Sequence, residues 1–326
     1  MARPRSASWL NGTRRSACGL ALVVGVGAVA ALGCSTAPAS PSSVAWTKNG
    51  SKYALTFGTT YLEVDAANGA RISALRLAGE HGRDLVADSA TTGEADNWGS
   101  TFWPSPQSWP WPPTDAGSIN AINTLPYDAV NDALTLTLKS QVNATAPMVS
   151  VSKKFSVDTG KNALVIDYTM SNGGSQPVTV APWEITRVPP GGLTFYGSSS
   201  APVASSLPLM PTQNAAGATW TQHDPTDTTE YKLFADGQGW LAHAAGTLLL
   251  IKSFPDISAA QSAPGEAEIE IYSAPKYVEI EQQGAVQTLG VGEALHWTVR
   301  WYVRQLAAPA TLGSADLVAQ VRSQIQ

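Results

Sequence analysis

The 326-residue sequence predicts an all-β fold, and three observations lead to that prediction. First, several segments alternate apolar and polar residues with a period of two, which is typical of strands that bury one face. Second, turn signals separate these segments, among them Asn68-Gly69 and Asp236-Gly237. Third, a single segment has clear helical spacing, and it lies at the C-terminus. Many antiparallel strands with few helices indicate a large sandwich whose sheets pack face to face.

The expected strands follow one another along the whole chain. Alternation is clearest at 134–139, 164–170 and 295–304, where every second residue is apolar. The other strands are expected at 52–57, 59–64, 70–78, 148–156, 176–188, 230–235, 239–253, 267–273 and 277–283. The terminal helix should begin after Ser314, an N-cap residue type, because apolar residues then recur at helical spacing: Leu317, Val318, Val321 and Ile325.

The N-terminus has the pattern of an export signal. Four arginines precede an apolar run from Ala17 to Leu32, which is shorter than the roughly 20 residues that span a bilayer. The run ends at Ala31-Leu32-Gly33-Cys34, which resembles the lipobox of bacterial lipoproteins. We therefore expect residues 1–33 to be a signal peptide, Cys34 to be lipidated, 34–43 to be a flexible tether and 44–326 to form one domain in the bacterial cell envelope.

Charge and cysteine content restrict the classes of partner. Without residues 1–33 the chain has 16 Lys and Arg against 25 Asp and Glu, and Cys34 is its single cysteine. An acidic surface disfavours nucleic acid, and one cysteine allows no internal disulfide. We expect a monomer that meets the membrane through its lipid only.

The stretch 97–113 (NWGSTFWPSPQSWPWPP) holds four tryptophans and five prolines. Because proline lacks an amide donor and restricts the residue before it, we expect a loop here and neither a helix nor a central strand. The rings either roof the core or form a surface that stacks on sugar rings, and both uses can apply to different rings. The proposed sugar-binding residues of this stretch are Asn97, Trp98, Trp103, Gln107 and Trp111.

The segment 277–283 is the strongest candidate for acid–base chemistry. On a strand, Tyr277, Glu279 and Glu281 share one face. Two like charges two positions apart repel, so partial burial would leave one carboxyl with a raised pKa, able to transfer protons. A solvated outer face is the simpler alternative, but a tyrosine beside the carboxylates suits sugar hydroxyls.

A second candidate strand runs through residues 180–187. Its alternation predicts that Trp183 and Arg187 point to one face and Glu184 to the other. An edge strand with a surface ion is the alternative to a cleft here. Of the histidines, His223 and His243 are the candidate site members, although a single histidine is more often structural.

The sequence lacks the usual signatures of metal, nucleotide and serine-hydrolase sites. It has no HExxH, P-loop, GxGxxG or GxSxG pattern. We therefore expect no metal and no cofactor.

Several short motifs resemble the galactose mutarotase-like (aldose 1-epimerase-like) superfamily. Leu62-Glu63-Val64-Asp65 and Gly69-Ala70-Arg71-Ile72-Ser73-Ala74-Leu75 resemble its opening strands. Residues 277–281, followed by Leu289-Gly290-Val291-Gly292-Glu293, resemble its late catalytic strand and the turn after it. The Trp- and Pro-rich stretch looks like an uncharacterised bacterial lipoprotein branch of the superfamily.

The resemblance implies a β-supersandwich of large antiparallel sheets with a sugar cleft on a concave sheet face. It also implies that Glu281 acts as the base that takes the proton from the anomeric hydroxyl. The family's Asn-His-x-Tyr-Phe motif, which would carry the acid, is not found after Ser171-Asn172. Glu184 or His243 could supply the acid instead.

We therefore expect a lipid-anchored protein that binds carbohydrate and could act on it as an aldose epimerase. The expected base is Glu281 and the expected acid Glu184 or His243, with Arg71 as a clamp and the sugar-binding set completed by Trp183, Arg187, Tyr277 and Glu279. Three alternatives stay open: a non-catalytic glycan-binding lipoprotein, a glycoside hydrolase with a Glu281–Glu184 pair, and a structural envelope protein.

Overall fold

A computed structural model describes residues 44–80, 83–110, 113, 118–198 and 200–326. The expected signal peptide, lipidated Cys34, tether and ring of Trp111 lie outside these residues. The described residues form one compact unit. None of the described helices is both long and apolar enough to cross a membrane.

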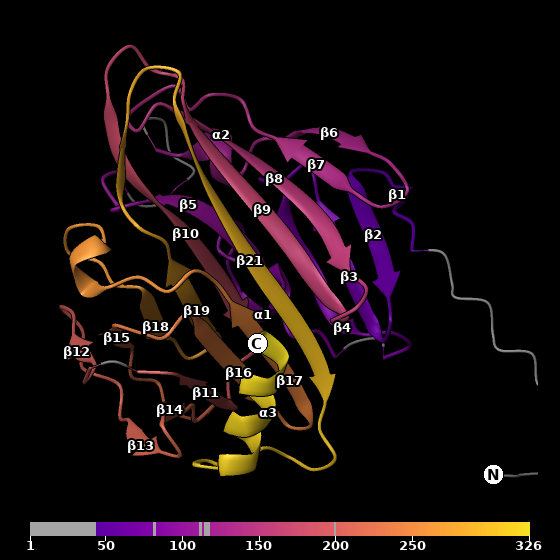
Figure 1. The fold of residues 1–326 in the computed structure, drawn as a ribbon, viewed down its shortest axis with the longest axis vertical. Helices are drawn as coiled ribbons and strands as arrows, with labels where there is room; N and C mark the ends of the chain where they lie inside the picture. Colours follow the sequence, from indigo (N-terminus) through magenta and orange to yellow (C-terminus); the bar gives the residue numbers. More distant parts are fainter. Residues whose placement is uncertain (1–43, 81–82, 111–112, 114–117, 199) are drawn as a thin grey trace, which may run out of the picture. The chain divides into compact units, whose positions relative to one another are not determined.

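The described strands form two large antiparallel sheets, which are the two layers visible in Figure 1. The 11-stranded sheet contains, in spatial order, β1 (Thr47–Asn49), β2 (Lys52–Phe57), β3 (Thr60–Asp65), β4 (Arg71–Leu77), β5 (Ser100–Ser105), β10 (Val178–Val188), β19 (Val278–Gln283), β18 (Ile269–Ser273), β15 (Tyr231–Ala235) and β12 (Val203–Ala204), with β20 (Gln287–Leu289) beside β10.

The 10-stranded sheet has the spatial order β13 (Gln213–Ala215), β14 (Ala218–Gln222), β11 (Leu193–Tyr196), β16 (Trp240–Ala245), β17 (Leu248–Ser253), β21 (Ala294–Gln305), β9 (Ala163–Asn172), β8 (Val149–Asp158), β7 (Leu136–Lys139) and β6 (Asp128–Asn131). The short helical pieces are α1 (Ser89–Thr92), α2 (Asn120–Asn123), a 3-10 turn (Ala259–Gln261) and α3 (Ala315–Ile325). The predicted all-β sandwich with a short C-terminal helix is confirmed.

The main hydrophobic core lies between the facing sides of the two sheets. Phe102 of β5 stacks on Tyr168 of β9, with ring centroids 4.2 Å apart and planes at 13°. Both residues are buried among aliphatic side chains from both sheets. Side chains that alternate away from this core therefore point to the outer face of their sheet.

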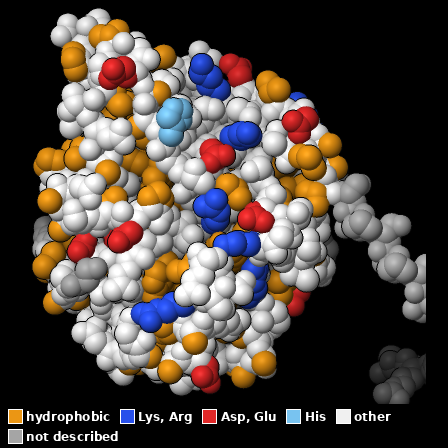
Figure 2. Space-filling model, viewed as in Figure 1, with side chains coloured by type: hydrophobic (Ala, Val, Ile, Leu, Met, Phe, Trp, Pro, Cys, Tyr) orange, Lys and Arg blue, Asp and Glu red, His pale blue; other side chains and the backbone are white. Residues whose placement is uncertain are grey.

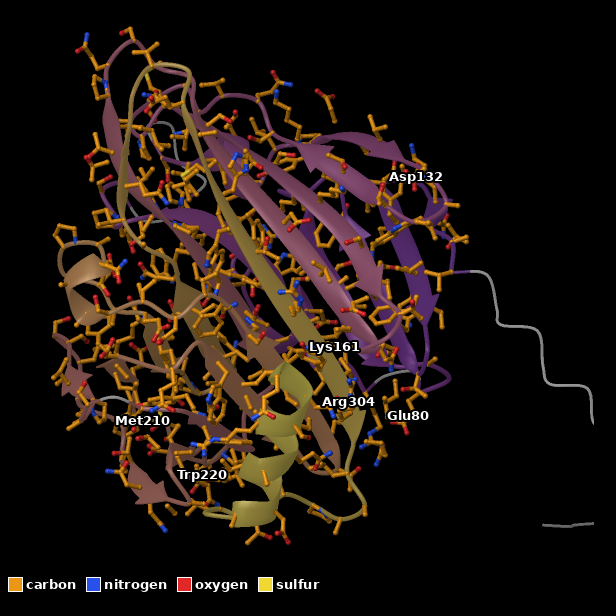
Figure 3. All side chains as sticks on the ribbon, in the orientation of Figure 1. Glu80, Asp132, Lys161, Met210, Trp220 and Arg304 are labelled. Atoms are coloured by element: carbon orange, nitrogen blue, oxygen red, sulfur yellow. The ribbon has the colours of Figure 1, made fainter. Side chains whose placement is uncertain are left out.

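A second apolar cluster forms where α3 covers the outer side of the 10-stranded sheet. Ser314 caps the helix, since its Oγ accepts from the amide of Leu317 at 3.2 Å. Val321 packs in the cluster with Trp220 of β14. Arg304 ties the helix end to the sheet through Gln324, and Figure 3 shows it beside Lys161, whose carbonyl it also binds. The expected N-cap and helical face are both found.

Two sequence predictions about strands are wrong in detail. The expected single strand 239–253 is a hairpin, because the chain turns at Gly246 with φ +59° between β16 and β17. The 97–113 stretch contains strand β5, which lies inside the sheet. Beyond Ser100 this strand has no pairing with β4, and Pro104 lies directly opposite Pro182 of β10, so the missing proline amides are tolerated.

The outer face of the 10-stranded sheet is mixed and polar. Figure 2 shows Lys and Arg side chains spread over β9 and β21 with acidic side chains between them. Exposed or half-buried residues of this face are Lys154, Asp167, Arg300 and Arg304. Basic and acidic side chains are thus mixed on this face.

Candidate functional site

Five neighbouring strands of the 11-stranded sheet, β5, β10, β19, β18 and β15, bring distant residues together. Trp103 of β5 lies opposite Trp183 of β10, and Ile185 of β10 lies opposite Glu281 of β19. Glu281 in turn lies opposite Glu270 of β18. The side chains of such a row share one face, and here it is the outer face of the sheet.

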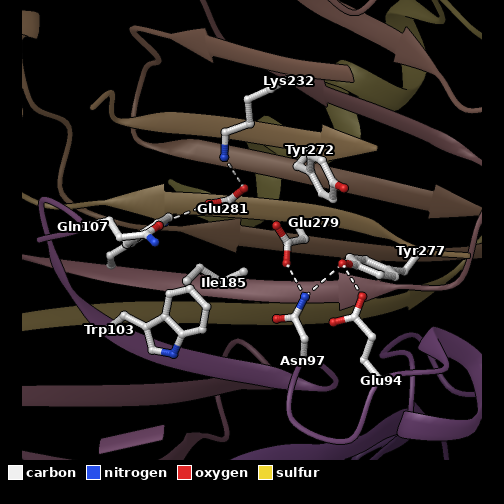
Figure 4. A pocket seen from close by; sticks show the side chains of 11 residues that line it. Glu94, Asn97, Trp103, Gln107, Ile185, Lys232, Tyr272, Tyr277, Glu279 and Glu281 are labelled. Atoms are coloured by element: carbon white, nitrogen blue, oxygen red, sulfur yellow. Dashed lines mark hydrogen bonds and ion pairs between the residues drawn. The ribbon is translucent and has the colours of Figure 1, made fainter. Parts of the chain in front are cut away.

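A cavity of about 420 Å³, hereafter the main cavity, lies on this outer face. Its volume is within the roughly 300–1,000 Å³ typical of small-molecule sites. Figure 4 shows most of its lining side chains, which are those of Glu94, Asn97, Trp103, Gln107, Trp183, Ile185, Lys232, Tyr272, Tyr277, Glu279 and Glu281.

Glu281 is the buried carboxylate of the main cavity. Its Oε2 accepts from Nε1 of Trp183 at 2.9 Å, and its Oε1 lies 2.6 Å from Nζ of Lys232. Burial raises the pKa of Glu281, although the ammonium of Lys232 opposes the shift. The result is a carboxyl group that holds a proton more readily than an exposed one.

Lys232 is shared between two carboxylates. Its Nζ lies 2.7 Å from Glu270 and 2.6 Å from Glu281. Burial alone lowers the pKa of Lys232, but these two carboxylates outweigh burial and raise it. The lysine therefore stays charged, and its charge is already committed to protein groups.

The opposite end of the main cavity is a hydrogen-bond network around Asn97. Its Nδ2 donates to the hydroxyl of Tyr277 at 2.9 Å and to Glu279 at 3.4 Å, as the dashed lines of Figure 4 show. The Tyr277 hydroxyl donates to Glu94 at 3.1 Å. The two contacts of Nδ2 fix the orientation of the amide. Its oxygen, Oδ1, is buried and has no hydrogen-bond partner among the described residues.

Arg187 supports this network from behind. Its Nε donates to Glu279 at 2.9 Å and its Nη1 to Thr101 at 2.7 Å. The guanidinium is fully buried and lies 5.2 Å from the ring centroid of Trp103. Arg187 thus fixes Glu279 without lining the main cavity itself.

Three tryptophans pack together at one wall of the main cavity, and most of their surface is buried against other residues. Trp103 meets Trp183 edge to face, with centroids 5.5 Å apart, and meets Trp109 at 6.0 Å. All three are at most 5% exposed. The rings of Trp103 and Trp183 still border the main cavity, so they serve both the core and the surface.

The structure gathers seven of the sequence-predicted site residues at the main cavity: Asn97, Trp103, Gln107, Trp183, Tyr277, Glu279 and Glu281. Gln107 is exposed at the edge, where its backbone N–H donates to the carboxylate of Glu266 at 3.1 Å. The prediction that the aromatic 97–113 stretch and an acidic strand nearly two hundred residues further on meet at one hollow agrees with this geometry, although Trp103 lies on strand β5 and not on a loop. Trp111 lies outside the described residues.

Glu184 lies on the opposite face of the sheet from Glu281. It faces the core, where it accepts from Tyr168 at 2.5 Å and Trp301 at 3.0 Å and lies 3.1 Å from Nζ of Lys252. The alternation along β10 puts it there, because Trp183 and Ile185 take the outer positions. This position does not fit an acid that acts with Glu281, nor the glycoside hydrolase pair.

His243 lies on β16 of the 10-stranded sheet and His223 directly after β14, and neither lines the main cavity. Both imidazoles contact the hydroxyl of Thr194, at 3.0 Å and 2.8 Å. Burial lowers the pKa of His223 to about 4, and burial together with His223 lowers that of His243 to about 3. No described histidine lines the main cavity, so the expected His243 acid is misplaced for chemistry there.

Arg71 and Trp98 do not line the main cavity either. Arg71 is buried, and its guanidinium donates hydrogen bonds to four backbone carbonyls, those of Asn68, Asp96, Trp98 and Asn123. Its guanidinium also lies 4.4 Å from the ring centroid of Trp98. Arg71 therefore holds the 96–98 backbone and cannot be a direct clamp on a sugar in this geometry.

Sequence reasoning missed three polar residues of the main cavity: Glu94, Lys232 and Tyr272. Lys232 and Tyr272 lie on strands that were expected, and they lie opposite one another in neighbouring strands. Alternation gives the face of each residue within its own strand. It does not reveal which strands are neighbours, so these two could not be assigned to the site.

Comparisons with known proteins support the fold. No protein-family model and no curated protein matches the sequence. Among solved structures, a galactose mutarotase-like protein from Lactobacillus casei ATCC 334 has a TM-score of 0.58 at 12% identity, covering 77% of this chain and 99% of that one. A galactose mutarotase related enzyme from Lactobacillus acidophilus has a TM-score of 0.53 at 8% identity, covering 80% and 100%.

A third similar structure is the Slr1438 protein from Synechocystis sp. PCC 6803. Its TM-score is 0.56 at 13% identity, and the match covers 79% of this chain and 97% of that one. Identities this low speak for the fold alone. The chain therefore has the fold of the galactose mutarotase-like proteins, as the sequence motifs indicated.

Proposed function

We propose that this protein binds a carbohydrate in the main cavity. One observation carries the proposal: tryptophan rings, a buried carboxylate and the side-chain amide of a buried asparagine border the same hollow. The apolar faces of a sugar suit the rings of Trp103 and Trp183. Sugar hydroxyls suit the carboxylates of Glu281 and Glu279 as acceptors, and both residues line the cavity.

The charges of the main cavity favour an uncharged sugar. Lys232 is the single basic side chain among the described residues that line it, and two carboxylates already hold its ammonium. Glu94 and Glu279 add further negative charge. A sugar phosphate or a uronic acid would therefore meet repulsion with no spare cation to offset it.

Aldose epimerisation is the second candidate, suggested by the names of the similar structures and favoured by Glu281. A buried carboxylate with a raised pKa can accept the anomeric proton. The ring oxygen would then take a proton as its bond to the anomeric carbon breaks. The acids at hand are Lys232 and the hydroxyls of Tyr272 and Tyr277, whose pKa values are all raised, the tyrosines' by burial. Since they are weak acids, we place binding before catalysis.

The same proposal includes anchoring to the envelope by a lipid on Cys34, as the N-terminal pattern indicates. Mass spectrometry of the mature protein tests this part. Cleavage before Cys34 with an added diacylglycerol supports it. An unmodified cysteine, or cleavage elsewhere, overturns it.

Titration calorimetry with uncharged monosaccharides (glucose, galactose, mannose and N-acetylglucosamine) tests the binding. Asn97→Leu should weaken binding of the sugar that binds best by about tenfold or more, because leucine cannot donate to Tyr277 and Glu279, which the amide of Asn97 holds in place at the cavity. Asn131→Leu, on the exposed edge strand β6, is the matched control and should bind as the wild type does. If no sugar binds the folded protein, the proposal is wrong.

Polarimetry on the sugar that binds separates the two candidates. If Glu281→Gln abolishes an epimerisation that the wild type performs, the protein is an enzyme. If neither the wild type nor Glu281→Gln changes the rate of mutarotation although both bind the sugar, the protein is a binder.

A further inference from the structure

A second, smaller cavity adjoins the main cavity and is here named the side cavity. Its volume is about 240 Å³, and it shares Glu94, Tyr272 and Tyr277 with the main cavity. Figure 4 shows these three side chains gathered at one end of the main cavity, away from Trp103 and Gln107. The two cavities are thus neighbours, and the side cavity lies between the end of α1 and the turn that joins β18 to β19.

We propose that the two cavities are consecutive subsites for an uncharged oligosaccharide, with one sugar unit in the main cavity and the next in the side cavity. This inference rests on the proposed carbohydrate function and adds the class of ligand, a glycan of at least two units. The side cavity alone is smaller than the roughly 300 Å³ at which ligand sites begin. It therefore makes sense as an extension of the main cavity and not as a separate site.

Two tyrosines form the boundary between the subsites. The ring centroids of Tyr272 and Tyr277 lie 6.1 Å apart, with planes inclined at 54°. Both residues line both cavities, so two sugar units that meet at this boundary would contact the same pair of rings. Aromatic rings at such a junction can stack on either unit and accept hydrogen bonds at their hydroxyls.

Hydrogen bonds hold the backbone on both sides of the boundary. The turn between β18 and β19 is closed by the amide of Ala274, which donates to the carbonyl of Tyr277 at 2.9 Å. On the other side, Asp88 caps α1 through the amide of Thr91 at 2.8 Å, and α1 ends at Gly93 beside Lys276. A preformed groove of this kind loses little entropy when a ligand binds.

The outer end of the side cavity is open and polar. Glu230 and Lys276 line it there and are exposed. With Glu94 at the boundary, the side cavity has two carboxylates and one ammonium, which disfavours an anionic glycan. An exposed far end allows a longer chain to continue into solvent.

Calorimetry with matched sets of mono- and trisaccharides tests this inference: glucose with maltotriose, mannose with mannotriose, and N-acetylglucosamine with its β-1,4-linked trimer. In the matching set, the wild type should bind the trimer about tenfold or more tightly than the monomer, as one further stacked and hydrogen-bonded unit would give. Ala274 lines the side cavity but not the main cavity, so Ala274→Phe would fill the side cavity while its backbone still donates to Tyr277. It should remove this advantage and leave the affinity for the monomer unchanged.

Glu230→Gln is the milder variant and should reduce the trimer advantage without changing the shape of the groove. Ala129→Phe, at a half-buried position on β6 in the other sheet, is the control for an added ring and should keep the advantage. If monomer and trimer bind the wild type equally, or if Ala274→Phe keeps the advantage, the subsite inference is wrong and carbohydrate binding stands. If no sugar of either length binds, the proposed function itself fails.

Discussion

The indole Nε1 of Trp183 donates a hydrogen bond of 2.9 Å to Oε2 of Glu281, the buried carboxylate of the main cavity. One tryptophan therefore contributes a ring to the cavity wall and orients the group on which the chemistry of the site would depend. The contact joins β10 and β19, which are neighbours in the sheet although the two residues are 98 positions apart.

Trp183→Phe keeps a ring and removes this donor. We expect a loss of about 1–3 kcal/mol in the free energy of unfolding, because the buried carboxylate loses a partner. Affinity for the bound sugar should fall as well, since Glu281 is no longer held in place. Urea denaturation and calorimetry measure the two effects.

Trp301→Phe is the matched control for that variant. Trp301 of β21, in the 10-stranded sheet, donates to Glu184 at 3.0 Å in the core between the sheets. The Trp301→Phe variant should lose a similar amount of stability and retain its affinity for the sugar. Equal losses of affinity in both variants would show that stability alone governs binding.

Lys232→Met should be strongly destabilising at neutral pH, by about 3–5 kcal/mol, because it leaves two buried carboxylates without their cation. Burial already raises the pKa of Glu270 and Glu281 in the wild type, and loss of Lys232 raises both further. A carboxyl whose folded pKa exceeds its unfolded value loses stability as pH rises through the folded pKa.

The deficit of Lys232→Met should therefore be smallest near about pH 4 and grow toward neutral pH. Chemical denaturation of wild type and variant at a series of pH values checks this. Adding Glu270→Gln should restore part of the stability. A deficit that does not depend on pH would contradict the assigned charges.

Arg71→Lys tests whether Arg71 positions the loop that carries Asn97. Arg71 donates to the carbonyls of Asp96 and Trp98, on either side of Asn97, and lysine cannot reach all four of its acceptors. We expect a loss of about 1–3 kcal/mol in stability and a weaker affinity for sugar, although residue 71 does not line the main cavity. Arg76→Lys is the control. Arg76 lies in the same strand as Arg71 and pairs with Asp84, so this variant loosens that ion pair and should keep the affinity for sugar.

The two buried histidines predict acid sensitivity of the fold. The pKa of His223 is lowered to about 4 and that of His243 to about 3, so the unfolded chain binds more protons below about pH 6.5. Their contribution is complete above that pH and is lost as pH falls toward the folded values, to a limit of about 3 kcal/mol or more for each imidazole.

The variant His223→Gln with His243→Gln should lose less stability than the wild type between about pH 6.5 and pH 4. Urea denaturation along this series, with the variant as reference, removes the contribution of the carboxylates, which both proteins share. Parallel curves would contradict the assigned neutral imidazoles.

The sequence predicted on which face of its strand a side chain lies better than it predicted which strands lie next to one another. Alternation correctly placed Trp183 and Arg187 on one side of β10 and Glu184 on the other, and it grouped Tyr277 with Glu281. A two-residue period follows from strand geometry, so it can be read without knowledge of the fold. This is why the aromatic and acidic halves of the site could be named.

The order of strands within the sheet could not be read in the same way. Lys232 reaches Glu281 across β18, and nothing in the local pattern of β15 identifies that neighbour. Glu184 was proposed as a partner for Glu281 from chemistry alone, and its own alternation placed it on the wrong face. The many prolines of 97–113 predicted a loop where strand β5 lies. The pairing of Pro104 with Pro182 makes this strand possible, and it depends on two strands that are distant in sequence.

The alternation of β10 has a consequence for how this chain can vary. Trp183 serves the cavity while its neighbour Glu184 serves the buried ion pair with Lys252. Inserting one residue upstream in this strand would exchange the two sets, driving an indole inward and a core carboxylate outward. Length changes of one residue should therefore be confined to the connecting loops, while the strand itself tolerates only replacement.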